Sequence, residues 1–276
     1  MNVNEALHLA RRRGVDRLDA QLLLCHLLTV DRAWLIGHDD HMLTGAQALL
    51  LEDGLRRRVD GEPLAYIVGR KEFHGLDLRV TPDTLVPRPD TEVIVDWAIE
   101  LLGGRPAARV IDLGTGSGAI ALAVKKSVPD ARVEAVERSA GALAVAQDNA
   151  RRLGLDIGWH AGDWFAPVVG ERFDLVLSNP PYIAEGDSHL SALTHEPNSA
   201  LTAGPDGLYD LRAIIAAAPD HLVPGAWLLL EHGYDQAEAV ATLLRERGFA
   251  NVRLRLDLGG QPRVTGGCWR EPVAAM

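Results

Sequence analysis

Residues 173–182 read FDLVLSNPPY, an apolar run that stops at two consecutive prolines. The run predicts a buried strand over residues 173–178. Neither proline has an N–H to donate and each fixes its own φ near about −65°, so the strand must end at Asn179. A rigid turn therefore follows the carboxyl end of a strand, which is where open α/β sheets bind their ligands.

The turn itself offers two free hydrogen-bond acceptors. The Asn179 side-chain amide and the Pro180 carbonyl cannot pair with a sheet, and the ring of Tyr182 follows directly after Pro181. Two acceptors beside a flat ring suit a planar NH2 group, because the acceptors take its hydrogens and the ring packs on its face. Asparagine and proline are equally common in loops that bind nothing, so the turn alone leaves both interpretations open.

Composition indicates a globular chain. Of its 276 residues, 47% are hydrophobic and 24% are charged, and the formal net charge is −10. The length suits one large or two modest domains. The longest apolar runs fall far short of the roughly 20 residues that span a bilayer, and the first residues lack the features of a signal peptide. We expect a cytoplasmic protein without membrane association, and its acidity argues against stable binding to nucleic acid.

The first quarter of the chain differs from the rest in its pattern of apolar residues. Helical spacing of apolar residues over 18–28 and 46–59, the latter after an N-cap at Thr44, predicts a small helical bundle for residues 1–70. A hairpin around Gly75 marks residues 71–84 as a linker. Prolines on both sides of Arg88 then hold the chain extended, and Asp90 is predicted to cap a helix that runs to residue 102.

From residue 109 the chain alternates short apolar runs with helical patterns, which predicts a parallel, doubly wound α/β sheet. The last two strands are separated by only six residues, too few for a crossover, so this pair must be antiparallel. The predicted strands are 109–112, 132–136, 157–160, 173–178, 226–230, 251–256 and 263–268, and the predicted helices are 119–126, 140–153, 208–218 and 236–247.

A glycine-rich loop follows the first of these strands. Residues 112–119 read DLGTGSGA, and the next strand ends at Glu137. Glycines allow a close approach of the backbone to a ligand over the helix start, and the carboxylate lies where an acid would hold two ribose hydroxyls. The pattern also satisfies the dinucleotide fingerprint. Two features favour S-adenosylmethionine over NAD. Gly118 comes directly after Ser117, which makes the loop wider, as an amino-acid tail requires. The fourth strand ends in the turn of residues 179–182, where a hydride acceptor would instead need a proton relay.

Over nearly its whole length the chain resembles the release factor glutamine methyltransferases, the PrmC/HemK family. The NPPY turn alone is shared with enzymes that methylate amino groups of DNA adenine or RNA guanine. The PRP segment together with a helical N-terminal bundle is specific to a much smaller group of proteins. Asp90 stands where the family commonly has Glu, and Glu137 where many members have Asp. The residues that carry the resemblance are 61–69, 87–92, 112–119, 162–165, 178–183, 196–197 and 204–208.

The resemblance implies a Rossmann-like, seven-stranded class I methyltransferase domain over residues 85–276 and a release-factor-binding helical domain over 1–70. It implies methyl transfer from S-adenosyl-L-methionine, leaving S-adenosyl-L-homocysteine, to the glutamine amide of the Gly-Gly-Gln motif in class I peptide chain release factors. Trp164 is expected beside the adenine, with Asp163 holding the adenine amino group. The implied site consists of the catalytic turn Asn179, Pro180, Pro181 and Tyr182, and of the cofactor residues Gly114, Thr115, Gly116, Ser117, Gly118, Glu137, Trp164 and Asn179.

Two rival functions make different demands on the sequence. A methyltransferase acting on exocyclic amino groups of DNA or RNA needs a basic groove or a base-reading insertion, and an acidic chain with short loops shows neither. A protein that only binds the cofactor or the release factor, without catalysis, would be expected to have substitutions in the glycine loop or in the NPPY turn. Both motifs are intact in this sequence.

Three smaller expectations follow. The histidines at 38 and 41 lie in a polar loop without a third cluster nearby, so no metal site is expected. Residues 259–261 read GGQ, like the target motif, but two glycines and a polar residue are ordinary hairpin chemistry, and self-methylation is not expected. A monomer is the expected state.

Overall fold

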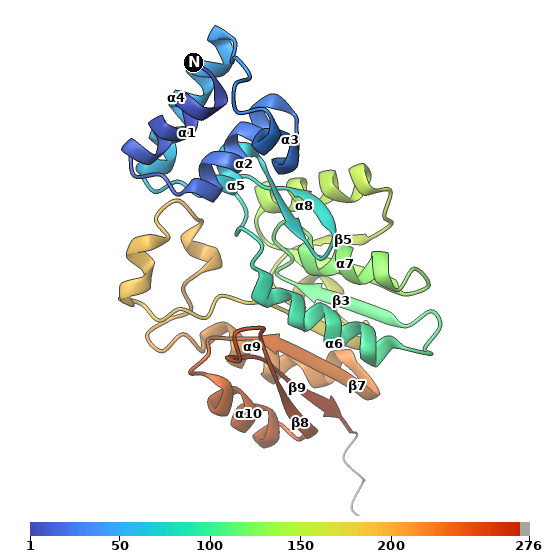
Figure 1. Ribbon diagram of the computed structural model, residues 1–276. Coiled ribbons are helices and arrows are strands. Elements are labelled where there is room, and N and C mark those ends of the chain that lie inside the picture. The colour runs from blue at the N-terminus through green and yellow to red at the C-terminus, as the bar shows by residue number, and fades with distance from the viewer. Residues whose placement is uncertain (271–276) are drawn as a thin grey trace, which may run out of the picture. The chain divides into compact units, whose positions relative to one another are not determined.

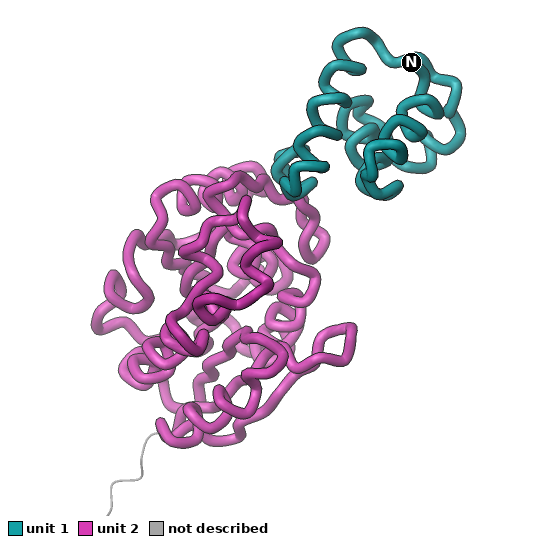
Figure 2. The backbone as a smooth tube through the Cα atoms, turned by 90° about the vertical axis from the view of Figure 1, so that its left-hand side faces the viewer, with its two compact units in different colours: residues 1–70 teal, residues 71–276 magenta. Residues whose placement is uncertain are grey.

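The computed structural model describes residues 1–270, which fall into two compact units (Figure 2). The first unit is Met1–Arg70, and the second begins at Lys71. The hairpin that the sequence suggested as a linker, residues 71–84, groups with the second unit.

The regular structure of the first unit is helical, apart from an isolated bridge between Asn2 and Met42 and from Arg70, with which strand β1 begins. Its helices α2 (Arg17–Leu28) and α4 (Gly45–Val59) pack Leu23, Leu24, Leu51 and Leu55 into one apolar core. The predicted N-cap at Thr44 is confirmed, because its side chain accepts from the Gln47 N–H in a capping box. The helices are α1 (Val3–Arg12), α2 (Arg17–Leu28), α3 (Arg32–Gly37), α4 (Gly45–Val59) and α5 (Leu64–Val68).

The second unit carries a short hairpin and a seven-stranded sheet with flanking helices (Figure 1). The hairpin pairs β1 (Arg70–Phe73) with β2 (Leu76–Arg79). The elements that follow are η1 (Pro89–Thr91), α6 (Glu92–Leu102), β3 (Arg109–Leu113), α7 (Ala119–Ser127), β4 (Arg132–Glu137), α8 (Ala140–Leu153), β5 (Gly158–Ala161), η2 (Ala166–Val168), β6 (Phe173–Ser178), η3 (Ser188–Ala192), η4 (Asn198–Ala200), α9 (Tyr209–Ala217), η5 (Ala218–His221), β7 (Leu222–Glu231), α10 (Ala237–Glu246), β8 (Phe249–Leu256) and β9 (Pro262–Trp269).

The sheet has the strand order β5-β4-β3-β6-β7-β9-β8, with β9 antiparallel to both of its neighbours and the other pairs parallel. The predicted α/β class is confirmed, as is the antiparallel final pair. From β3 the chain runs outward to β5 and then returns to β6 on the other side of β3. The strand order therefore reverses between β3 and β6, and such a reversal opens a crevice at the carboxyl ends of the strands.

The sheet is buried on both faces, because successive side chains of a strand point to opposite sides. On β3, Val110 joins a core with α6 and α7, whereas its neighbour Ile111 joins a core with α9 and α10. On β6, Leu175 and Val176 divide in the same way. Continuous apolar runs were the sequence signal of these strands, and this two-sided burial is their cause.

The predicted helix cap at Asp90 is wrong. A turn of 3-10 helix, η1, takes up Pro89–Thr91, and α6 begins only at Glu92 without a side-chain cap. Asp90 lies inside η1, and its carboxylate pairs with Arg263 Nη2 on β9 at 3.5 Å. The proline at the first position of the turn moves the helix start beyond the residue that was expected to cap it.

No helix among residues 1–270 is long and apolar enough to cross a membrane.

Candidate active site

Three strands end side by side where the strand order reverses. The registers pair Leu113 at the end of β3 with Val136 on β4 and with Ser178 at the end of β6. The Ser178 hydroxyl donates to the Leu113 carbonyl at 2.7 Å, which ties the ends of β3 and β6 together. The loops after β3, β4 and β6 therefore start from one edge of the sheet.

The loop after β3 is the glycine-rich segment. Gly114, Gly116 and Gly118 all have positive φ, of 71°, 58° and 85°, which side chains with a Cβ rarely adopt. A Cβ on Gly114 would lie 3.1 Å from Cζ3 of Trp164, so the glycine lets the backbone pass close to the indole ring. Helix α7 starts directly after the loop, at Ala119, and Ala119 and Ile120 in its first turn line a pocket at this edge of the sheet.

Glu137 ends β4 with its carboxylate against this loop. Oε2 accepts from the Gly116 N–H at 2.9 Å, and Oε1 accepts from the Ser139 N–H at 2.8 Å. The side chain is buried yet lines the pocket. A carboxylate oxygen has more than one acceptor site, so Glu137 is fixed in place and can still accept two hydroxyl donors.

Asp112 lies beneath the same loop. It is fully buried, and Thr115 Oγ1 donates to its Oδ2 at 2.5 Å, while Oδ1 has no partner among the described residues. Burial raises the pKa of Asp112 to about 7, against the hydrogen bond from Thr115, which lowers it. Asp112 thus holds the loop from below and does not face the pocket.

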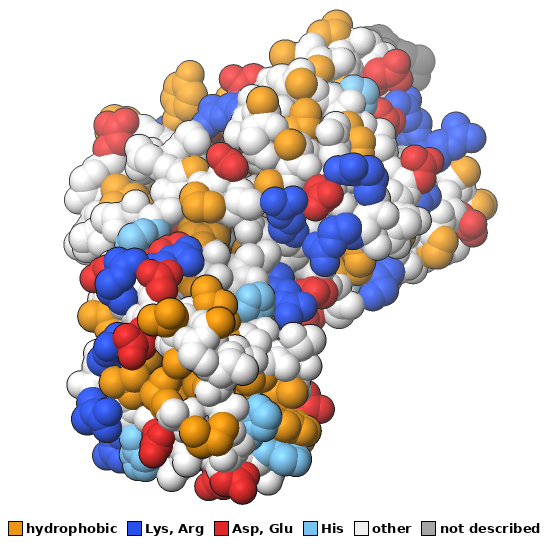
Figure 3. Space-filling view, turned by 90° about the horizontal axis from the view of Figure 1, so that it is seen from above, with side chains coloured by type: hydrophobic (Ala, Val, Ile, Leu, Met, Phe, Trp, Pro, Cys, Tyr) orange, Lys and Arg blue, Asp and Glu red, His pale blue; other side chains and the backbone are white. Residues whose placement is uncertain are grey.

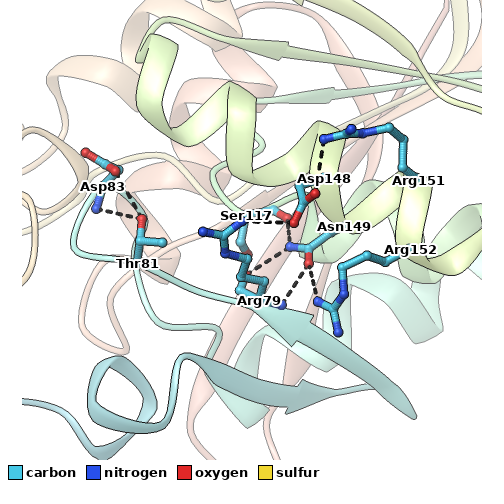
Figure 4. Close-up of polar contacts among 8 residues, drawn as sticks. All are labelled: Arg79, Thr81, Asp83, Ser117, Asp148, Asn149, Arg151 and Arg152. Carbon is cyan, nitrogen blue, oxygen red and sulfur yellow. Dashed lines mark hydrogen bonds and ion pairs between the residues drawn. The ribbon is translucent and has the colours of Figure 1, made fainter.

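The far side of the glycine loop is tied down by Asn149 on α8 (Figure 4). Its Nδ2 donates to the Ser117 carbonyl at 2.9 Å and to the Arg79 carbonyl at 3.0 Å, and its Oδ1 accepts from the Arg79 N–H at 2.7 Å. The side chain is completely buried. Asn149 thereby connects the loop to the end of β2, and nothing in the sequence pattern singled it out.

Trp164 lies beside the loop with an unusual backbone. Its φ is 43°, in the left-handed region, and its indole lines the pocket. The buried Asp210 on α9 has a raised pKa, mainly because of its burial. Asp163, by contrast, does not line the pocket; its exposed carboxylate lies 3.7 Å from Arg138 Nη1.

The four residues of the NPPY turn after β6 lie partly at the pocket and partly in the protein interior. Asn179 and Pro181 line the pocket, whereas Pro180 and Tyr182 do not. Asn179 Nδ2 donates to Thr91 Oγ1 at 3.3 Å. The Tyr182 hydroxyl lies 3.5 Å from Oε1 of Glu231, and its ring packs against the core of α9 and α10. Burial raises the pKa of Tyr182, so the phenol stays neutral.

The structure thus brings the predicted cofactor residues into one pocket of about 930 Å³ of empty space, partly open to solvent. Gly114, Thr115, Gly116, Ser117, Glu137, Trp164 and Asn179 all line it, whereas Gly118 forms the left-handed N-cap of α7 just behind it.

Two contacts made by arginine side chains, which sequence reasoning did not foresee, lie on one side of this pocket. Arg88, which lines it, forms an ion pair with Glu196, whose other oxygen accepts from the Val86 N–H at 3.1 Å. Arg138, another lining residue, donates to the Ser199 carbonyl at 2.8 Å. Both contacts attach the loop around η4 to the pocket walls, and their partners lie too far apart in sequence to be paired by pattern.

The back of the NPPY turn depends on Gly207. Its φ is +70°, and a Cβ there would lie 2.3 Å from the Tyr182 carbonyl oxygen and 2.8 Å from Gln236 Nε2. That amide nitrogen donates to the same carbonyl at 2.9 Å. We expect Gly207→Ala to lower the free energy of unfolding by about 2 to 4 kcal/mol, because strain and a backbone clash add.

Gly225→Ala is the matched control in a denaturant titration. Gly225 also has positive φ, of +84°, but nothing lies within 4 Å of a Cβ there. Only the conformational cost remains, about 1 kcal/mol. Equal losses for the two variants would show that the contact between Gly207 and the turn is unimportant.

Comparisons with known proteins agree with this geometry. Residues 4–69 match the PrmC N-terminal domain, and residues 96–204 match the methyltransferase small domain. A release factor glutamine methyltransferase of Bordetella pertussis is 48% identical over 257 residues, which cover 92% of this chain and 95% of that protein. One of Xylella fastidiosa is 47% identical over 265 residues, with coverage of 95% and 96%.

A solved structure shares the fold. It is that of a T. thermophilus 16S rRNA methyltransferase in complex with AdoMet and guanosine, with a TM-score of 0.55, 20% identity, and coverage of 73% of this chain and 50% of that one. Sheet, glycine loop and turn together define an S-adenosylmethionine-dependent class I methyltransferase. With nearly half of all positions identical over almost the full length of its relatives, the chain belongs to the release factor glutamine methyltransferase family.

Proposed function

We propose that this chain transfers the methyl group of S-adenosylmethionine to the side-chain amide nitrogen (N5) of the glutamine in the Gly-Gly-Gln motif of class I peptide chain release factors. Family membership supports the substrate class. The observation that carries the chemistry is the Asn179 amide, which lines the same pocket as the glycine loop and has its NH2 group turned toward Thr91. Its carbonyl oxygen is then left to accept a hydrogen bond from the substrate.

The residues of the pocket fit the cofactor. Glu137 would accept from the two ribose hydroxyls, and the backbone of residues 114–118 would lie against the amino-acid tail. Trp164 would pack beside the adenine. Its indole can lie at the pocket wall because Gly114, which it contacts, has no side chain that would push it away. When bound, S-adenosylmethionine supplies an electrophilic methyl group and leaves as S-adenosylhomocysteine.

The NPPY turn would supply positioning and electrostatic stabilisation. An amide nitrogen is a poor nucleophile because its lone pair is delocalised into the carbonyl. Asn179 Oδ1, which lines the pocket, would accept one N–H of the substrate amide, and the carbonyl oxygen of Pro180, a residue that does not line it, would accept the other once the substrate is bound. The two bonds would fix the nitrogen and favour positive charge growing on it. No base has to act first, because the N–H becomes acidic as the methyl group arrives and can then lose its proton to water.

Tyr182 is proposed to shape the amide pocket by packing. We expect Tyr182→Phe to keep kcat within about threefold of the wild type, because the hydroxyl contact to Glu231 is long, at 3.5 Å. Tyr182→Ala removes the ring and should lower kcat tenfold or more, by roughly the 1.4 kcal/mol that corresponds to a factor of ten. Steady-state kinetics with both variants tests this role, and equal losses would assign the effect to the hydroxyl.

The first unit is proposed to bind the release factor, and a monomer is proposed as the working enzyme. Stable nucleic-acid binding is not expected of a chain with a formal net charge of −10. On the face seen in Figure 3, Asp and Glu side chains lie among Lys and Arg and among hydrophobic groups. Since the proposed substrate works on the ribosome, we propose that the enzyme acts in the cytoplasm.

The proposal is tested by transfer of a radiolabelled methyl group to a class I release factor, beside the same factor with its motif glutamine changed to alanine. Label on the first and none on the second is expected. Label on DNA or RNA instead would assign the same site to an exocyclic amino group of nucleic acid, and would overturn the proposed substrate.

A further inference from the structure

A buried carboxylate beside the pocket takes no part in the chemistry described so far. The side chain of Glu196 is 2% exposed, and both of its oxygens have a partner. Oε1 accepts from Arg88 Nη2, and Oε2 accepts from the Val86 N–H at 3.1 Å. A buried carboxylate is costly unless it is paired and hydrogen-bonded, so these two contacts bind Glu196 firmly to residues 86–88.

The backbone of Arg88 is fixed as well as its side chain. Pro87 and Pro89 stand on either side, and Arg88 has the extended φ of −100° and ψ of 143° that a following proline favours. The Thr91 N–H donates to the Arg88 carbonyl at 3.1 Å, and the Thr91 hydroxyl accepts from Asn179 Nδ2 at 3.3 Å. One tight turn of the chain therefore separates Arg88 from the residue that contacts Asn179.

Most of the Arg88 guanidinium is left for a ligand. An arginine carries N–H donors on three nitrogens, and among residues 1–270 only Nη2 of Arg88 has a hydrogen-bond partner. The side chain is 41% exposed, and it lines the pocket. Its remaining N–H groups can thus donate to acceptor oxygens that enter the pocket.

The Gly-Gly-Gln motif of the proposed substrate offers such oxygens on its main chain. Because glycine has no side chain, a site can recognise the two glycines only through their main-chain N–H and carbonyl groups. Arginine donates through a planar, permanently charged fork that suits oxygen acceptors. The carboxylate of S-adenosylmethionine is an acceptor of the same kind. Arg88, however, is connected through Thr91 to the proposed substrate contact, whereas the proposed cofactor residues 114–118 and Glu137 lie at the ends of β3 and β4.

We propose that Arg88 binds a main-chain carbonyl oxygen of the Gly-Gly-Gln segment, and that Glu196 is a positioning residue that holds Arg88 in place for this contact. The inference rests on the proposed function. It adds a contact for the main chain of the substrate to the contact that Asn179 makes with the side-chain amide.

Arg88→Lys is the decisive variant, because lysine keeps a positive charge for Glu196 but replaces the fork with a single nitrogen. We expect KM for the release factor to rise about tenfold or more, since a hydrogen bond from a charged group is lost. At saturating release factor kcat should stay within about threefold, because the bond is the same in the ground state and in the transition state. The dissociation constant of S-adenosylmethionine should stay within about twofold.

Steady-state kinetics and calorimetry together distinguish the two oxygen ligands. An unchanged KM for the release factor would refute the contact between Arg88 and the substrate. A loss of S-adenosylmethionine affinity as large as the rise in KM would assign Arg88 to the cofactor carboxylate, and it would equally refute the inference.

Arg109→Lys is the matched control. Arg109 pairs with Glu134 and with Glu171, each at 2.7 Å, and it does not line the pocket. The substitution weakens ion pairs of the same kind, so it can lower stability, but KM for the release factor should stay within about twofold of the wild type. Equal rises of KM in the two lysine variants would show that a weakened fold causes the effect, and would overturn the inference.

A double-mutant cycle tests the positioning role of Glu196. Glu196→Gln keeps the shape and removes the charge that holds the guanidinium, so KM for the release factor should rise about three- to tenfold. In the Arg88→Lys background the same substitution should change KM by less than about twofold, because the contact through which Glu196 acts is already lost. Effects that multiply would show that Glu196 acts independently of Arg88, and the positioning role would fall.

These outcomes can be told apart from a failure of the proposed function. If the wild-type enzyme labels no release factor, the proposed function itself fails. If the wild type labels the release factor and Arg88→Lys behaves like it, only the inference about Arg88 and Glu196 fails.

Discussion

Asn179→Ala is expected to lower kcat for methylation of a release factor about 100-fold or more, as removal of one preorganised polar group does in other active sites. The variant lacks the Oδ1 acceptor, so the substrate nitrogen is no longer fixed and the charge that grows on it loses its nearest partner. Asn179 is one of many residues along the pocket wall, and the cofactor would be held by Glu137 and residues 114–118. The dissociation constant of S-adenosylmethionine should therefore change by no more than about threefold.

Asn179→Asp is the matched comparison, because it keeps an acceptor oxygen of the same reach, while it replaces the donor to Thr91 with a second acceptor and adds a negative charge. It should retain clearly more activity than the alanine variant. Single-turnover rates at saturating cofactor, with binding measured by calorimetry, separate the two effects. An alanine variant with an unchanged turnover rate would refute the acceptor role of Asn179, and one that loses cofactor binding to the same degree would make it a binding residue.

Glu137→Ala is expected to weaken S-adenosylmethionine binding by about 10- to 100-fold, since hydrogen bonds to a charged group contribute roughly 1.5 to 3 kcal/mol. The loss has two sources. The ribose hydroxyls lose their acceptor, and the Gly116 and Ser139 N–H groups lose the carboxylate that orders the loop. At saturating cofactor the rate should recover most of its wild-type value, because Glu137 does not contact the substrate amide in the proposed mechanism.

The control for this variant is Glu134→Gln on the same strand. Glu134 is a half-buried carboxylate paired with Arg109 at 2.7 Å and with His160 at 2.9 Å, and it does not line the pocket. Its replacement should lower stability while leaving cofactor affinity within about twofold. Calorimetric dissociation constants for both variants decide the matter: equal affinities would show that Glu137 does not hold the ribose.

Much of the fold could be predicted because local and tertiary signals agree. The strands of the second unit are apolar runs buried on both faces, and each observed strand overlaps its predicted range. Strand β7 is the largest difference, since it begins at Leu222, four residues earlier than expected. The reason is local: Pro224-Gly225 reads as a turn, but β7 accommodates it where its pairing with β6 shifts register.

The parts of the site that the sequence did not predict are contacts between distant segments. The glycine loop, Glu137 and the NPPY turn carry short motifs whose backbone requirements appear in the residue types themselves. Thr91 meets Asn179 across 88 positions, and Glu196 meets Arg88 across 108, and no local pattern encodes such pairs. The expected cap at Asp90 was wrong because the 3-10 turn η1 takes up Pro89–Thr91 and moves the helix start to Glu92.

The most direct test of the central claim is the site of methylation. A class I release factor incubated with this enzyme and S-adenosylmethionine, digested and analysed by tandem mass spectrometry, should carry one added methyl group on the side-chain nitrogen of the Gly-Gly-Gln glutamine. The same digest covers the enzyme itself, where Gln261 is expected to remain unmodified. An unmodified motif glutamine, with the methyl group found on another residue or on nucleic acid, would contradict the account.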